Sequence, residues 1–137
     1  MRRVLPAMVA ALLVGACGGG GPDPGGASAR PCEGLLSPAN PAATLPVDLP
    51  AADGQTVYEK ATQGATTIWF AYARGADVVA SRDALKAKFA AAGYTRLDDD
   101  AEPPAEAELQ FEGTYTGSVQ VVPLCAGYLR IRYRVSR

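Results

Sequence analysis

Residues 106–135, EAELQFEGTYTGSVQVVPLCAGYLRIRYRV, alternate apolar and polar side chains along three stretches. The stretches are 106–112, 118–123 and 128–135, and turn-forming residues separate them. A period of two residues is typical of strands with one buried face and one solvated face. The segment therefore predicts three strands of an antiparallel sheet.

A helix is predicted upstream of these strands, at residues 82–92. Leu85 and Phe89 lie four residues apart and therefore share one face of that helix. Ser81 is the expected N-cap, and Gly93 is the expected left-handed residue that ends the helix. The pattern predicts a helix that packs through a single apolar face.

Three further strands are predicted outside these segments. Residues 66–73, TTIWFAYA, are largely β-branched or aromatic, which favours a central and mostly buried strand. Shorter strands are predicted at 54–58 and 94–97, and an acidic loop is predicted at 98–104. The element order ββαββββ predicts an α+β domain, in which one helix packs on one face of a mainly antiparallel sheet of about five or six strands.

Residues 1–17 carry a signal about location rather than fold. A short basic start and an apolar stretch at 4–14, too short to span a bilayer, are typical of a signal peptide. The motif VGAC at 14–17 resembles the lipobox of bacterial lipoproteins. That resemblance implies that residues 1–16 are removed and that Cys17 becomes an N-terminus acylated with fatty acids such as palmitate.

The lipobox resemblance also implies a place in the bacterial cell envelope. Gly18, rather than an aspartate, favours the outer membrane in bacteria that have one, and otherwise the anchor lies in the outer face of the cell membrane. Residues 17–44 are rich in glycine and proline and poor in large apolar side chains, which predicts a flexible tether behind the lipid. Residues 45–137 then form the single folded domain.

Two cysteines remain beyond the lipobox, Cys32 and Cys125. Thiols in an exported chain usually pair because the compartment is oxidising, so a structural disulfide between them is expected. A redox-active pair is disfavoured because the chain has no Cys-x-x-Cys motif, and two free buried thiols remain the other alternative.

The composition argues against several classes of function. The chain has no histidine, which removes the usual general base and a common metal ligand. Its net charge of −1 is unlike the basic footprint of a nucleic-acid-binding protein. The carboxylates at 98–102 resemble the start of a calcium loop, but Pro103 and Leu109 stand where that loop needs glycine and glutamate. We therefore expect no catalytic site, no cofactor and no metal site.

A row of arginines is the most site-like feature of the sequence. Arg130, Arg132 and Arg134 share the solvated face of the last predicted strand, where they could bind phosphates or carboxylates. The glutamates of 106–112 line the same face, and arginine side chains could reach them across the intervening strand. The favoured interpretation is a face that neutralises itself, and binding of a partner is the alternative.

Aromatic residues form a second candidate ligand surface. Because the chain has few large aliphatic side chains, these rings are expected in the core instead. They are Tyr58, Trp69, Tyr72, Tyr115 and Tyr128.

Together these features predict a lipid-anchored envelope protein whose domain is a non-catalytic binding module. Its expected contacts are the membrane, through the N-terminal lipid, and another envelope protein or an envelope polymer, but not nucleic acid. A structural or accessory subunit that pairs through a sheet edge is the alternative. A hydrolytic enzyme is the least favoured interpretation.

Overall fold

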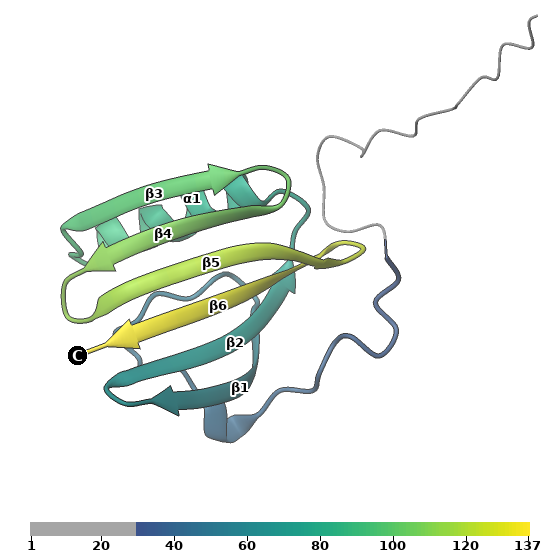
Figure 1. The fold of residues 1–137 in the computed structure, drawn as a ribbon, viewed down its shortest axis with the longest axis horizontal. Helices are drawn as coiled ribbons and strands as arrows, with labels where there is room; N and C mark the ends of the chain where they lie inside the picture. The colour runs from purple at the N-terminus through teal and green to yellow at the C-terminus, as the bar shows by residue number, and fades with distance from the viewer. Residues whose placement is uncertain (1–29) are drawn as a thin grey trace, which may run out of the picture.

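The computed structural model describes residues 30–137, which form one six-stranded antiparallel sheet and one α-helix (Figure 1). The α+β fold predicted from the sequence is therefore confirmed. The predicted signal peptide, the lipobox and the first part of the tether lie outside the described residues. The elements are a short 3-10 helix η1 (Pro41–Ala43), then β1 (Thr56–Gln63), β2 (Thr66–Arg74), α1 (Val78–Ala91), β3 (Arg96–Glu102), β4 (Glu106–Glu112), β5 (Thr116–Cys125) and β6 (Tyr128–Ser136).

The sheet order, β1-β2-β6-β5-β4-β3, places the last strand of the chain in the interior of the sheet. Strands β3 to β6 follow one another as a meander, and β6 then pairs with β2. Trp69 therefore lies opposite Tyr133, although the two residues are far apart in the sequence. This closure makes β2, which the sequence predicts as central, a strand with neighbours on both sides.

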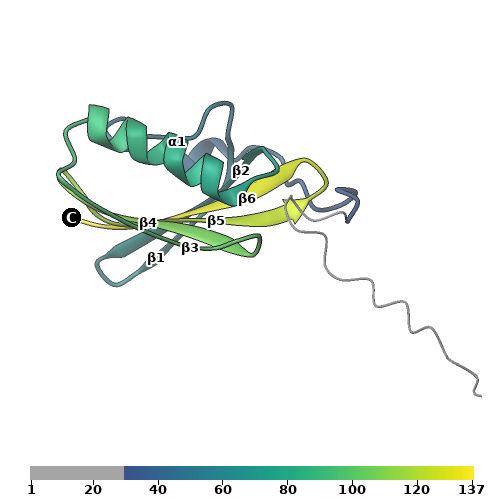
Figure 2. The same cartoon turned by 90° about the horizontal axis from the view of Figure 1, so that it is seen from above.

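One face of the sheet, which we call the inner face, is covered by α1 and by the irregular segment 44–55 (Figure 2). The helix contacts β3, β4 and β5, and Phe89 on its apolar face is fully buried. The irregular segment buries Leu49 and reaches the phenol of Tyr133, which donates to Gln55 Oε1 at 2.7 Å. Burial of this phenol raises the pKa of Tyr133.

Helix α1 begins earlier than predicted, at Val78 rather than at residue 82. Asp77, not Ser81, is the N-cap, because its Oδ1 accepts two backbone N–H groups of the first turn at 2.8 and 3.0 Å. Valine has a modest helix propensity, but Val78 is only 2% exposed, and its burial outweighs that preference. The predicted helix start was therefore wrong by one turn.

The C-terminal end of α1 agrees with the prediction. Gly93 has a φ of +87°, which lets the chain reverse after the helix. The N–H of Tyr94 then donates to the carbonyl of Phe89 at 3.1 Å, and the two rings pack with their centroids 4.9 Å apart.

The acidic loop predicted at 98–104 is wrong, because most of it is strand β3. Pairing with β4 overrides the low strand propensity of aspartate. Asp99 points toward the helix side, where it accepts from Lys86 and lies 3.2 Å from Arg82. Asp98 and Asp100 lie on the opposite face, so the alternation of a strand keeps their carboxylates in solvent.

Strand β1 is longer than the stretch 54–58 predicted for it. Pairing with β2 extends it to Gln63, and a bulge interrupts the register between Val57 and Glu59. The N–H of Asn40 donates to the carbonyl of Val57 at 3.0 Å, so that η1 lies beside this strand.

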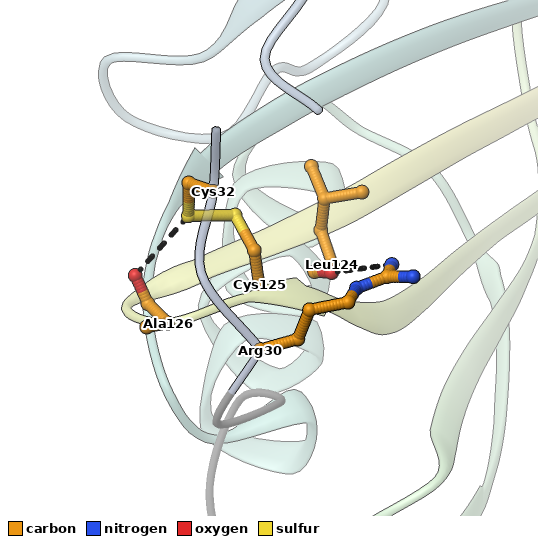
Figure 3. Close-up of a disulfide and its surroundings, with 5 residues drawn as sticks. All are labelled: Arg30, Cys32, Leu124, Cys125 and Ala126. Atoms are coloured by element: carbon orange, nitrogen blue, oxygen red, sulfur yellow. Dashed lines mark hydrogen bonds between the residues drawn. A yellow bond between two sulfur atoms is a disulfide. The ribbon is translucent and has the colours of Figure 1, made fainter. Parts of the chain in front are cut away.

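The segment 30–44, which we assigned to the tether, contacts the sheet at several points. The predicted disulfide between Cys32 and Cys125 is present, and Cys125 is fully buried (Figure 3). Next to it, the guanidinium of Arg30 donates to the carbonyl of Leu124 at 3.1 Å. The hydroxyl of Tyr72 donates to the carbonyl of Ser37 at 2.9 Å. The domain boundary predicted at residue 45 therefore falls inside a segment that lies against the sheet.

Candidate functional site

The face of the sheet opposite α1, which we call the outer face, carries no helix among residues 30–137 (Figure 2). Its side chains are the alternate residues that the strands turn away from the core, and they are half-buried or exposed. The face is divided by charge and by residue type. Strand β6 contributes arginines, β1 and β2 contribute aromatic rings, and β3 and β4 contribute carboxylates.

The arginine row consists of Arg130, Arg132 and Arg134, and it runs along the middle of the outer face on β6. Successive guanidinium groups start from positions about 7 Å apart, because two residues of a strand rise by that distance. Arg130 and Arg134 are exposed and Arg132 is half-buried. None of the three has an ion pair within the part of the chain that the structure describes.

The acidic row on β4 consists of Glu106, Glu108 and Glu112. Strand β5 separates it from the arginine row, which puts the two rows about 10 Å apart. Gln120 on β5 instead donates to Glu106 Oε2 at 2.7 Å. Direct pairing of the two rows, which the sequence favoured, is therefore absent between the described residues, and the arginines face solvent.

An aromatic cluster lies beside the arginine row on the same face. Ring centroids are 6.4 Å apart for Tyr58 and Phe70, 5.9 Å for Tyr58 and Tyr72, and 5.9 Å for Tyr72 and Tyr128. The prediction that these tyrosines belong to the core was wrong, because their strand positions turn them outward. Burial raises the pKa of Tyr58, and the positive charge of Arg130 opposes that shift.

The two remaining aromatic residues of the predicted set are in the core, as expected. Trp69 is 5% exposed and Tyr115 is 6% exposed. The indole N–H of Trp69 has no hydrogen-bond partner among the described residues. A hollow of about 290 Å³ beside these rings includes Lys60 and Arg137, but each cation already stacks on one of the two rings.

Each arginine of the row stands opposite an apolar or aromatic side chain of β2. The pairs are Arg130 with Tyr72, Arg132 with Phe70, and Arg134 with Ile68. The sequence alone did not reveal these pairs, because they depend on β6 lying next to β2. The sequence signal that could have indicated these pairs is the alternation of arginines in one strand together with outward aromatic residues in another.

A hollow on the inner face offers a weaker site. It measures about 410 Å³ and lies between α1, β2 and β6, with a floor of aliphatic side chains that includes Leu129. Its polar groups are largely engaged, since Lys88 pairs with Asp53 at 2.5 Å and Asp77 caps the helix. Arg74 at its rim lies 5.1 Å from the ring centre of Tyr128. The hollow therefore lacks a set of unpaired polar groups that would orient a ligand.

The buried cation of the domain is structural. Arg82 is 6% exposed, and its guanidinium donates to Asp83 and to the carbonyl of Asp100, both at 2.8 Å. The hydrogen bond from Lys86, assisted by Arg82, holds the pKa of Asp99 below its usual value. These contacts attach the edge strand β3 to the helix. Residues 30–137 contain no group of three or more cysteine or acidic side chains placed to hold a metal ion.

Both edges of the sheet carry features that oppose strand addition. Four of the seven residues of the edge strand β3 are acidic, and all four lie between Asp98 and Glu102, as is common at protected edges. The β1 edge has a bulge and is contacted by Asn40 of the preceding segment. The outer face is therefore a better candidate for partner binding than either edge.

No protein family, curated protein or solved structure matches this chain. Within residues 30–137 no helix has the length and hydropathy needed to cross a membrane.

Proposed function

We propose that this protein is a lipid-anchored protein of the bacterial cell envelope whose domain binds an anionic partner through its outer face, without catalysis. The lipobox at 14–17 supports the anchor. The arginine row supports the anionic partner, because its three guanidinium groups have no ion pair among the described residues. This second observation carries the proposal.

An unpaired arginine row is suited to reversible capture of negative charge. Guanidinium groups remain protonated throughout the physiological pH range and match carboxylate and phosphate groups in shape. Because no ion pair among the described residues has to break, an incoming anion need not displace a carboxylate from Arg130, Arg132 or Arg134. Such contacts hold a ligand but supply neither a nucleophile nor a general base, which fits a binding role.

The anchor is tested at Cys17. Intact-mass analysis of the wild-type protein from its native membrane should show an acylated Cys17 as the N-terminus. The Cys17→Ser variant should remain an unprocessed precursor without lipid, because the hydroxyl cannot replace the thiol that the processing pathway modifies. A water-soluble wild-type protein that begins at another residue would contradict the anchor.

The binding face is tested by replacing Arg130, Arg132 and Arg134 together by glutamine. We expect affinity for the immobilised polyanions polygalacturonate and poly-L-glutamate to fall about tenfold or more at physiological salt, because three charge contacts are lost. The thermal midpoint should change little, because none of the three side chains is buried and none makes an ion pair among the described residues.

The matched control replaces three basic residues outside the row, Lys60, Arg96 and Arg137, by glutamine. This control changes the net charge by the same amount and should retain most of the binding. Equal loss in both triple variants would mean that overall charge attracts the polyanion, and the proposed site would be wrong.

A further inference from the structure

We infer that the anionic partner is a linear polysaccharide with carboxylate groups, lying along β6 with its sugar rings over the aromatic cluster. This inference rests on the proposed function and adds the class of ligand and its direction on the sheet. It follows from the spacing of the arginines, the carboxylates on either side of the arginine row and the side chains opposite each arginine.

The spacing selects an extended ligand. Arg130 and Arg134 are separated by roughly 13 Å along one strand, and Arg132 lies midway between them. A single small anion can contact one guanidinium or two neighbouring ones, but it cannot reach all three. A chain that carries repeated negative charges can engage the whole row.

The side chains on either side of the arginine row leave room for a single polyanion chain. On one side of β6, strand β5 presents the neutral side chains Ser118 and Gln120, and the carboxylates of β4 follow. On the other side, β2 presents apolar and aromatic side chains, and Glu59 of β1 follows opposite Phe70. Carboxylates thus flank the arginine row on both sides, and their repulsion keeps a polyanion aligned with β6.

The side chains of β2 favour rings over a peptide. Tyr72 and Phe70 lie directly opposite Arg130 and Arg132, so a carboxylate held by an arginine places the adjoining ring of the ligand beside an aromatic face. Aliphatic C–H groups of a sugar ring are attracted to the negative face of an aromatic ring. An acidic peptide would instead gain most from backbone hydrogen bonds, which the interior strands β2 and β6 have already used in the sheet.

The test compares two polymers of carboxylates, polygalacturonate with sugar rings and poly-L-glutamate without them. The wild-type protein should bind polygalacturonate about tenfold more tightly than poly-L-glutamate at equal carboxylate concentration. Galacturonate oligomers of increasing length should gain affinity until they span the row and then level off. Affinity is measured by calorimetry with the full chain, and backbone NMR shifts should follow β6 and β2.

Ring-replacing variants separate this inference from the proposed function. Phe70→Leu with Tyr72→Leu keeps apolar bulk and should weaken polygalacturonate binding about three- to tenfold, with poly-L-glutamate binding unchanged. Ile68→Leu is the matched control on the same face, and Tyr72→Phe keeps the ring while removing the hydroxyl that bonds Ser37; both should bind normally.

The binding results distinguish the polysaccharide ligand from the more general anionic partner. Equal affinity for the two polymers, or equal loss of both in the leucine variant, would overturn the polysaccharide and leave the anionic partner in place. If neither polymer bound the wild-type protein, both proposals would be wrong.

Discussion

Replacing Phe89 by alanine should destabilise the domain by about 3–5 kcal/mol, the range typical of a buried phenylalanine truncated to alanine. The side chain is fully buried, and its ring lies 4.5 Å from the ring of Phe111 and 4.9 Å from that of Tyr94, measured between centroids. The substitution therefore removes a large apolar contact of α1 with the sheet. A domain of this size is stable by only about 5–15 kcal/mol, so the loss is a large fraction of the total.

Urea denaturation followed by tryptophan fluorescence measures this loss directly. The chain has a single tryptophan, Trp69, which is 5% exposed and reports on the core beneath the sheet. Phe70→Ala is the matched control, because it makes the same chemical change on the half-buried outer face. We expect it to cost about 1 kcal/mol. Equal losses for the two variants would contradict the assignment of inner and outer faces.

The parts of the fold that the sequence predicts well are those in which local pattern and tertiary environment agree. Strand β4 has the predicted bounds, 106–112, and β6 differs from its predicted range by one residue, because each alternates cleanly and has neighbours on both sides. The end of α1 is also as predicted, since Gly93 can adopt a conformation that other residues avoid. In these places propensity and packing point to the same structure.

The predictions fail where a partner distant in the sequence decides the outcome. The aspartates of β3 have low strand propensity, and only pairing with β4 and the contacts of Asp99 with Arg82 and Lys86 make them a strand. The predicted pairing of the arginine row with the glutamates of β4 fails for the same reason. Facing rows of glutamate and arginine are visible in the sequence, but the contacts of Gln120 with Glu106 and of Arg96 with Glu112 depend on how β4 pairs with its two neighbouring strands.

Removal of the disulfide should also have a large effect, a loss of about 2–5 kcal/mol in the free energy of unfolding. The bond joins Cys32 to Cys125 across 93 positions of the sequence, so it closes most of the domain into one loop. Closing a loop of that length lowers the entropy of the unfolded chain. In the chain-entropy account this stabilises the folded state by about 4–5 kcal/mol. The comparison is between the wild-type protein and the double variant Cys32→Ala, Cys125→Ala, in which no thiol remains at either position.

The loss should be concentrated around the segment that the disulfide holds against the sheet. That segment supplies the carbonyl of Ser37 to the hydroxyl of Tyr72 and the N–H of Asn40 to the carbonyl of Val57. Amide exchange should therefore accelerate at Asn40 in the double variant, while the amides of the β5–β6 pairing retain most of their protection. Because Tyr72→Phe, which lacks the same hydrogen bond to Ser37, is expected to bind normally, the double variant should also bind polygalacturonate normally at temperatures where it is folded.

Reductant provides the control that assigns these effects to the bond itself. It should shift the urea midpoint of the wild-type protein toward that of the double variant and leave the midpoint of the double variant unchanged. Non-reducing peptide mapping of freshly isolated protein should yield one cross-linked peptide that contains both Cys32 and Cys125. Two thiols that alkylate without prior reduction would show that the bond does not form in the cell, and the segment 30–44 would then depend on its hydrogen bonds alone to stay against the sheet.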